Sequence, residues 1–481
     1  AVLLLFLRWP GWVGLPLSIL LLRYGVDAGL SPLLRYEYGW GKLQITDVTI
    51  IGPALAEEIP GAIEALTLGY GSVLVGMVLM RLVGGREGAL NFPPLGPAQD
   101  DHYYRKGFQA SYLLFGFGIF LYAVALLFAG RGLSLTEIAS TRAAFTNQEA
   151  YGSVLFNYAW LIKDSAQVGA IGMLLFAYRI RKHIRLAWLA NFVYLGIQPL
   201  FGGRTAIVVG GLALGVAYHY GIRKLKPLSM VLVMIPVMIG LVYVAMVRHG
   251  HTSIQSAAIV SLTQMASNRA MEEVAFSLKN FPKRTEYFNG TTLIGGISHA
   301  LPGLKAGDNL WLSLEERYLK QRTAQGIGGQ TMSTTSENYM NFGMPGVIVL
   351  GGLLGLLFGT VYEWQRKRPN DPIALLIASL MITVFIIAIY KKMAIRISDI
   401  PMQILLPSAF IVAWAEGRAF VVKLGMIFAS VLLGLAAFKL SDVSYMKYIS
   451  FIALILLYVY AILLVIRKRT PPQGARRAAC S

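Results

Sequence analysis

Arg204 is the residue whose surroundings most clearly suggest chemistry. It lies in a short turn, 201–205 with the sequence FGGRT, between two strongly apolar segments. An arginine in so short a connection has few local partners, and its planar guanidinium group can hold two phosphate oxygens at once. We therefore predict that Arg204 binds an anionic head group.

Other basic residues lie next to apolar segments or in the longest polar segment, where they can bind the same kind of group. These are Arg248, Arg317, Arg322, Lys391, Lys392 and Arg396. The alternative is that these side chains bind ordinary anionic lipids or pair with nearby acids, which are Glu272, Glu273, Glu315 and Glu316.

A single acid, Glu337, lies in a stretch rich in hydroxyl and amide side chains, 334–346 with the sequence TTSENYMNFGMPG. A carboxylate in this setting can act as a general base that removes a proton from a hydroxyl group. The alternative is an acid at the N-terminus of a helix, which the helix dipole stabilises. The next candidates for a base are His299 and His249.

A metal site is not expected from this sequence. His249 and His251 are spaced like two metal ligands, but no third ligand follows at a recognisable distance. The one cysteine, Cys480, allows neither a disulfide framework nor a cysteine metal site. We therefore predict chemistry without a metal or another cofactor.

Two adjacent charges, Lys163 and Asp164, lie inside the apolar segment 153–178. Charges inside a membrane-spanning helix are costly, so they usually line a cavity or a substrate path. Neighbouring residues on a helix point about 100° apart, so these two side chains do not simply pair with each other. The alternative is that one extends to the membrane surface while the other bonds a neighbouring helix.

The composition identifies the class of protein in which these residues work. Of the 481 residues, 56% are hydrophobic and 14% are charged, whereas about 25% are charged in a soluble domain. These values, with a mean hydropathy of +0.59, exclude a water-soluble enzyme and a disordered chain. The net charge of +19 suggests basic cytoplasmic loops, and no nucleic-acid partner is expected.

Apolar segments that approach the roughly 20 residues needed to cross a bilayer recur along the chain. They predict an all-α polytopic integral membrane protein with about 12 transmembrane helices and one large outer loop. The first span is interrupted at 8–11 by the sequence RWPG. The predicted spans are 1–22, 65–83, 107–130, 153–178, 186–201, 205–221, 228–247, 344–363, 372–390, 403–415, 424–438 and 448–466.

Clusters of Lys and Arg occupy alternate loops, among them 179–185, 223–226 and 366–368. The positive-inside rule places these loops and both termini in the cytoplasm. It places the long segment 248–343 outside. We therefore divide the chain into N-terminal transmembrane helices, a large periplasmic loop, and C-terminal transmembrane helices with a basic cytoplasmic tail. The boundaries are 1–247, 248–343 and 344–481.

In this arrangement the chain resembles the Wzy-type O-antigen polymerases, the oligosaccharide repeat-unit polymerases of the bacterial inner membrane. The resemblance rests on the short turn at Arg204, the long outer loop, and the segment 337–346 (ENYMNFGMPG) that leads into the next span. It covers the organisation of most of the chain, about residues 65–440. Arg-x10-Gly patterns also begin at Arg204 and Arg317, but a chain this rich in arginine and glycine contains such pairs by chance.

The resemblance implies a metal-independent glycosyltransferase that joins lipid-linked repeat units at the outer face of the inner membrane. The growing glycan would leave its polyprenyl diphosphate and join an incoming repeat unit. The basic residues, Arg204 foremost, would stabilise the leaving diphosphate, and Glu337 would deprotonate the acceptor hydroxyl. The implied partners are polyprenyl diphosphate-linked oligosaccharides, membrane lipids and a chain-length regulator protein.

Two other functions fit part of the sequence. The ligases of lipopolysaccharide assembly also use a large outer loop. An anion or solute transporter would explain Lys163, Asp164 and the outer basic residues as an anion path. It would not explain the long outer loop or the lack of an internal repeat.

Overall fold

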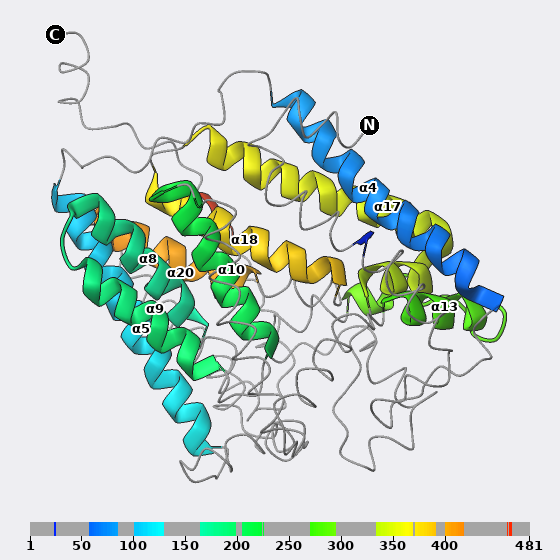
Figure 1. Ribbon diagram of the computed structural model, residues 1–481, viewed down its shortest axis with the longest axis horizontal. Coiled ribbons are helices and arrows are strands. Elements are labelled where there is room, and N and C mark those ends of the chain that lie inside the picture. The colour runs from blue at the N-terminus through cyan, green and yellow to red at the C-terminus, as the bar shows by residue number, and fades with distance from the viewer. Residues whose placement is uncertain are drawn as a thin grey trace, which may run out of the picture.

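The protein is described by a computed structural model. It places residues 24–25, 57–84, 101–128, 164–198, 204–223, 225, 270–294, 333–368, 371–390, 400–417, 459 and 461–463. Within these residues every assigned element is a helix (Figure 1). The elements are α4 (Ile59–Val83), α5 (Asp101–Phe128), α8 (Ser165–Ile180), α9 (Ile184–Ile197), α10 (Arg204–Gly221), α13 (Ala270–Asn280), α17 (Thr334–Arg366), α18 (Pro372–Tyr390), the π-helix η5 (Pro401–Leu405) and α20 (Leu406–Ala415).

The helices and the predicted spans agree well where the structure describes both. The span predicted at 372–390 has the bounds of α18, and α10 begins one residue before the span predicted at 205–221. Four starts differ by more than a few residues. Helix α4 begins at Ile59 rather than at 65, and α5 begins at Asp101 rather than at 107. Helix α8 begins at Ser165 rather than at 153, and α17 begins at Thr334 rather than at 344.

Two described helices, α4 and α17, are long and apolar enough to cross a membrane. The helices α8, α9 and the stretch 403–415 are apolar but shorter. The spans predicted at 1–22, 228–247 and 424–438 lie outside the described residues, and the span at 448–466 lies almost entirely outside them. The all-α class is therefore confirmed for the described part, and the count of twelve spans stays a prediction.

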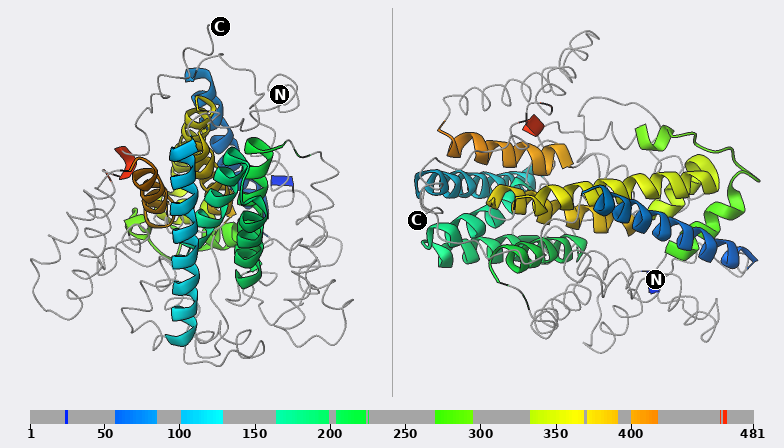
Figure 2. Two further views of the ribbon diagram at one scale, coloured as in Figure 1. Left: turned by 90° about the vertical axis from the view of Figure 1, so that its left-hand side faces the viewer. Right: turned by 90° about the horizontal axis from the view of Figure 1, so that it is seen from above.

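Helices α4 and α17 lie side by side and run in the same direction (Figures 1 and 2). A Cβ atom on Gly351 would lie 2.5 Å from the Ser72 hydroxyl, and one on Gly359 would lie 2.5 Å from the Cβ of Met80. A Cβ on Gly76 would clash with the α17 backbone. Small residues at such spacing let helix backbones approach closely, which is how transmembrane helices gain packing energy without a hydrophobic driving force.

Helices α5, α8 and α9 form an antiparallel group. A Cβ on Gly118 of α5 would clash with Ala166 at the start of α8, and one on Gly107 would clash with Phe176 near its end. The turn from α8 to α9 is short because Arg181 (φ 53°) and His183 (φ 60°) both adopt the left-handed conformation. That conformation costs roughly 1 kcal/mol or more for a residue with a Cβ, so tertiary contacts must hold it.

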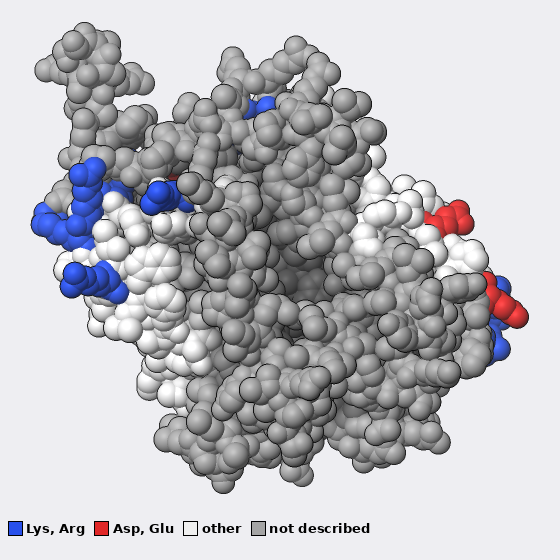
Figure 3. All heavy atoms as spheres, viewed as in Figure 1, with Lys and Arg blue, Asp and Glu red and all other residues white. Residues whose placement is uncertain are grey.

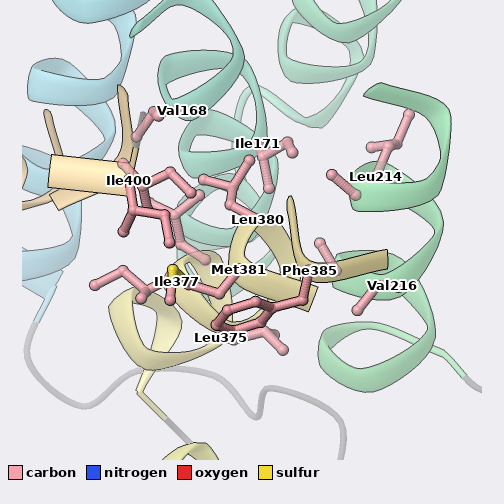
Figure 4. Packing of buried hydrophobic residues seen from close by; sticks show 14 of the residues in the cluster. Val168, Ile171, Leu214, Val216, Leu375, Ile377, Leu380, Met381, Phe385 and Ile400 are labelled. Carbon is pink, nitrogen blue, oxygen red and sulfur yellow. The ribbon is translucent and has the colours of Figure 1, made fainter. Parts of the chain in front are cut away.

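Helix α18 lies between these groups and carries much of the apolar core. Its side chains, with those of α8, α10 and Ile400, fill the space shown in Figure 4. Phe385 of α18 also packs on Phe358 of α17, with ring centroids 3.9 Å apart. Because α18 is buried on several sides, it connects the α4–α17 pair with the antiparallel group.

The described basic loops gather at one end of the bundle. The α8–α9 turn lies beside the start of α5, where His183 stacks on Phe108 at 5.3 Å and Arg179 lies over the Tyr104 ring at 5.1 Å. The end of α20 reaches the same place, since a Cβ on Gly417 would lie 3.1 Å from Lys106 Nζ. Figure 3 shows most of the visible Lys and Arg on this side, whereas the opposite side carries acidic groups together with a few basic ones.

Candidate active site

The first turns of α17 form a buried polar segment at the end of the bundle opposite the basic loops. Residues Thr334–Asn341 are all buried, although most of them are polar. The side chain of Ser333 caps the helix by accepting a hydrogen bond from the backbone N–H of Ser336 at 3.3 Å. The Thr334 hydroxyl donates to the carbonyl oxygen of Ala388 near the end of α18. A buried polar segment of this kind must be held by many hydrogen bonds, because each unpaired group costs free energy.

Helix α13 supplies part of that support from the long segment before α17. The buried carboxylate of Glu273 accepts a hydrogen bond from the backbone N–H of Ser333. The hydroxyls of Ser277 and Ser336 lie 2.6 Å apart, and that of Ser336 also donates to the Glu273 carbonyl at 3.1 Å. Figure 1 shows α13 lying across the ends of α4 and α17.

The segment 288–292 supports the first turns of α17 from another side through hydrogen bonds with Asn341. The Asn341 side chain donates to the Thr292 hydroxyl at 2.6 Å and accepts from the backbone N–H of Gly290 at 2.9 Å. It also donates to the carbonyl oxygen of Glu337 at 2.8 Å. Every polar atom of this amide is therefore used in joining the first turns of α17 to the segment that follows α13.

A sharp bend separates these turns from the rest of α17. Gly343 has φ 65° and ψ −155°, a conformation that is essentially restricted to glycine. A Cβ atom at this position would also lie 2.8 Å from the Tyr287 hydroxyl. Pro345 follows within the helix. The bend lets a buried polar segment continue into an apolar span.

Glu337, the predicted general base, lies in the middle of this segment. It is 1% exposed, and its backbone N–H donates to the Ser333 carbonyl at 2.9 Å. Both interpretations of Glu337 thus retain a structural basis: it lies in the first turn of a helix, and it lies among buried hydroxyl and amide groups. Its role as a base stays a prediction.

Asp164 belongs to a second polar cluster, formed by α5, α8 and α9. The Tyr122 hydroxyl donates to Asp164 Oδ1 at 2.8 Å and accepts from Gln198 Nε2 at 2.6 Å. The Tyr194 hydroxyl donates to Gln167 Oε1 at 3.3 Å. Figures 1 and 2 place this group of helices on the opposite side of α18 from α13.

Of the predicted span 153–178, the structure describes the part from Asp164 onward, so the position of Asp164 inside a longer span stays a prediction. Asp164 is the N-cap residue of α8, so it precedes the helix rather than interrupting it. An acid is favourable there because its charge meets the positive end of the helix dipole. Its side chain accepts a hydrogen bond from Tyr122 of the neighbouring helix α5. The alternative interpretation expected such a bond for one of the two charges.

Arg204 is the first residue of α10, and only its backbone is described. A Cβ on Gly210 of the same helix would lie 3.2 Å from the ring of Tyr194, so α10 begins beyond the end of α9. This is the end of the bundle that also holds Asp164 and the start of α17. The remaining predicted site residues lie outside the described residues; they are Lys163, Arg248, His249, His299, Arg317, Arg322, Lys391, Lys392 and Arg396.

Within the described part of the chain, no group of three or more His, Cys, Asp or Glu side chains is placed to hold a metal ion. His249 and His251 fall outside that part.

Comparison with known proteins adds a direct finding. The model of the O-antigen polysaccharide polymerase Wzy family matches residues 115–416, which is more than half of the chain. The chain belongs to this family. The match includes α8, α9, α10, α13, α17 and α18, and so both polar clusters. No curated protein and no solved structure matches the chain.

Membership of the Wzy family confirms the resemblance and the general class. Members are polytopic proteins of the bacterial inner membrane that act as glycosyltransferase-like polymerases on lipid-linked oligosaccharide repeat units.

Several residues that build these clusters were not predicted from the sequence. Glu273 was expected only to pair with loop cations, and Asn341, Tyr122 and Gln198 show no distinguishing pattern in the sequence. A usable signal existed for Glu273: with Ala270, Val274 and Ser277 it lies on one face of an amphipathic helix, and all four are buried. An acid on the apolar face of such a helix indicates a buried partner.

Proposed function

We propose that this protein polymerises polyprenyl diphosphate-linked oligosaccharide repeat units at the outer face of the bacterial inner membrane. The observation that carries the proposal is the buried polar segment 334–341, which lies within the family match and at the end of the bundle opposite the described basic loops. If those loops are cytoplasmic, as the positive-inside rule requires, this segment lies at the outer membrane boundary. Both termini are then in the cytoplasm.

The proposed reaction transfers the growing glycan from its diphosphate to an acceptor. The acceptor hydroxyl oxygen forms a bond to the anomeric carbon of the donor, and the bond from that carbon to the diphosphate oxygen breaks. The polyprenyl diphosphate leaves with the electron pair, and the hydroxyl proton passes to a base. In this proposal the base is Glu337, with His299 or His249 as alternatives.

Cationic side chains stabilise the leaving diphosphate in this scheme. Arg204 begins α10 at the same end of the bundle as the start of α17, because α10 and α18 are antiparallel and the end of α18 contacts Thr334. A guanidinium group can hold two phosphate oxygens at once. Arg248, Arg317, Arg322, Lys391, Lys392, Arg396, Lys163 and Asp164 complete the proposed binding set, and no metal takes part.

The test is synthesis by purified protein. The full chain in lipid nanodiscs receives lipid-linked single repeats extracted from a strain that lacks the protein, with no nucleotide and with EDTA present. A ladder of lipid-linked polymers is the expected product. Transfer of one preformed glycan to a lipopolysaccharide core acceptor, without a ladder, would identify a ligase instead. Activity that disappears with EDTA and returns with a divalent ion would refute metal independence.

A further inference from the structure

One tyrosine hydroxyl joins three helices at the end of the bundle where α10 begins. The hydroxyl of Tyr122 in α5 donates a hydrogen bond to Asp164 Oδ1 at the start of α8, at 2.8 Å. It accepts a hydrogen bond from Gln198 Nε2 at the end of α9, at 2.6 Å. We call these three residues the Tyr122 network. Figures 1 and 2 show α5, α8 and α9 lying side by side, so the network lies where their ends meet.

The direction of both hydrogen bonds is fixed by the chemistry of the partners. A carboxylate can only accept, and the Gln198 amide nitrogen can only donate, so the Tyr122 proton must point at Asp164. The Asp164 carboxylate is therefore held by a donor whose own orientation is set by a third residue. Such a chain of hydrogen bonds fixes one geometry more firmly than a single bond does.

The three residues differ in exposure. Tyr122 and Gln198 are each 2% exposed, whereas Asp164 is only half-buried. The Asp164 side chain also makes no capping hydrogen bond to the first turn of α8. Two buried side chains thus hold a carboxylate that stays partly open to its surroundings.

The packing of α5 on α8 leaves no slack around this network. A Cβ atom on Gly118 of α5 would clash with Ala166, and one on Gly169 of α8 would clash with the backbone of Phe115. Because the two backbones are in contact, the Tyr122 side chain cannot shift along α8 without disturbing them. The position of the donor is therefore fixed together with its direction.

The chemistry of a carboxylate limits what it can bind. It accepts hydrogen bonds and carries negative charge, so it suits a ligand with hydroxyl groups and repels a diphosphate. In a polyprenyl diphosphate-linked oligosaccharide, the glycan offers hydroxyl donors and the hydrocarbon chain offers none. The glycan is the part of this substrate that matches Asp164.

We infer that Tyr122 and Gln198 are positioning residues, which orient the Asp164 carboxylate to accept a hydrogen bond from a hydroxyl group of the lipid-linked glycan. This inference rests on the proposed function, and it assigns Asp164 to the sugar rather than to the diphosphate. Asp164 acts in binding, and Tyr122 and Gln198 act only through Asp164.

Tyr122→Phe is the decisive variant, because it keeps the ring and removes only the hydroxyl. It should weaken binding of the glycan about 3- to 10-fold, since the carboxylate loses the bond that orients it. Asp164→Ala should weaken binding about 10- to 100-fold, as expected for a lost bond to a charged group. If Tyr122 acts only through Asp164, adding Tyr122→Phe to Asp164→Ala should cause no further loss.

Binding is measured on the full chain in nanodiscs with two probes, the polyprenyl diphosphate bearing one repeat unit and the same polyprenyl diphosphate without sugar. Both single variants should weaken binding of the first probe only. KM for polymerisation should rise with little change in kcat, because the lost contact is a binding contact. The matched control is Tyr178→Phe, which should change neither affinity. The Tyr178 hydroxyl accepts a hydrogen bond from Trp188 Nε1 at 3.3 Å and joins α8 to α9 at their other end.

Thermal stability is recorded for every variant. Lower stability of Tyr122→Phe with unchanged affinity for the sugar-bearing probe would overturn the inference, because the network would then be structural only. Further loss of binding in the double variant would also overturn it, since Tyr122 would not act through Asp164. If Tyr122→Phe did not fold, Gln198→Leu, which removes the donor to the same hydroxyl, would replace it in the cycle.

Equal weakening for both probes would likewise overturn the inference, because Asp164 would then act on the diphosphate or the hydrocarbon chain. The binding assay does not depend on polymerisation. If the unchanged protein bound the sugar-bearing probe through Asp164 but made no ladder, the inference would stand and the polymerase function would fall.

Discussion

The buried carboxylate of Glu273 in α13 accepts a hydrogen bond from the backbone N–H of Ser333, the N-cap residue of α17. The two residues are separated by 60 positions, all of which lie within 248–343, the segment predicted to form a long outer loop. This contact joins that segment to the start of the helix that carries Glu337. It gives the long segment a direct means of positioning the proposed site.

Glu273→Ala should loosen the start of α17. A hydrogen bond to a charged group contributes about 1.5–3 kcal/mol, so the free energy of unfolding should fall by about that amount. Amide hydrogen exchange at 333–341 should become faster. Glu273→Gln keeps an acceptor oxygen and should lose less. Unchanged exchange in Glu273→Ala would show that the contact does not hold the segment.

Glu337→Gln should abolish most of the activity while the protein still folds. Gln keeps the shape of the side chain but cannot take a proton, and removing a general base costs about 10²–10⁴-fold in rate. Ladder formation from purified lipid-linked repeats provides the measurement. A helix-terminal acid without a catalytic role would instead cost about 0.3–1 kcal/mol of stability and leave activity intact. That result would make His299 or His249 the next candidate.

Arg204→Lys should reduce the rate of polymerisation about 10²–10³-fold. Lysine keeps the charge but cannot hold two phosphate oxygens in one plane, and a lost donor in a site that excludes water costs about 2–4 kcal/mol. The stability of the protein should change little. A lysine variant with full activity would show that charge alone is needed at this position.

Glu363→Gln should destabilise the C-terminal ends of α4 and α17, where the two helices are joined by a buried ion pair. The carboxylate lies 3.3 Å from Arg81 Nη1 and 2.7 Å from Arg366 Nη2, and all three side chains are at most 8% exposed. Breaking a buried ion pair by removing one charge costs about 3–5 kcal/mol. The control is Lys283→Ala, which removes the exposed pair between Lys283 and Glu58 and should cost less than about 1 kcal/mol. Equal thermal shifts for the two variants would contradict this expectation.

Single cysteines in a Cys480→Ser background test the orientation. Ser298→Cys and Ser398→Cys should react with an impermeant thiol reagent in intact cells, because both lie in segments predicted to be outside. Lys182→Cys, at an exposed position in the α8–α9 turn, should react only after lysis. The reverse pattern would invert the proposed topology and place the polar segment of α17 in the cytoplasm.

Long apolar segments were predictable from the sequence because a membrane span needs no information from the rest of the chain. The range 372–390 was predicted with the bounds of α18, and α10 differed by one residue. The start of α17 was not predictable in this way. Its first turns are polar, and their hydrogen bonds to α13 and to the segment 288–292 hold them as the beginning of the helix.

The residues of the candidate site were likewise predictable only in part. The sequence identified Glu337 and Asp164 as charges in unusual surroundings, because an acid near an apolar span is costly wherever its partners lie. It did not identify Tyr122, Gln198, Glu273 or Asn341, since these residues are ordinary until a partner from a distant segment is known.

The sequence by itself determined the membrane class, the approximate spans, the alternation of basic loops and the polymerase family. The first three properties follow from composition and local hydropathy, which each segment carries independently of the others. The family rests on the resemblance of particular segments and on the family match. The tertiary structure alone decided that α4 and α17 pack in parallel through glycines and that Glu273 reaches Ser333. Contacts between α4 and α17 join residues up to 282 positions apart, as in the pair of Arg81 and Glu363. Pairing over such separations depends on the complementary shapes of two helix surfaces, which neither segment reveals by itself.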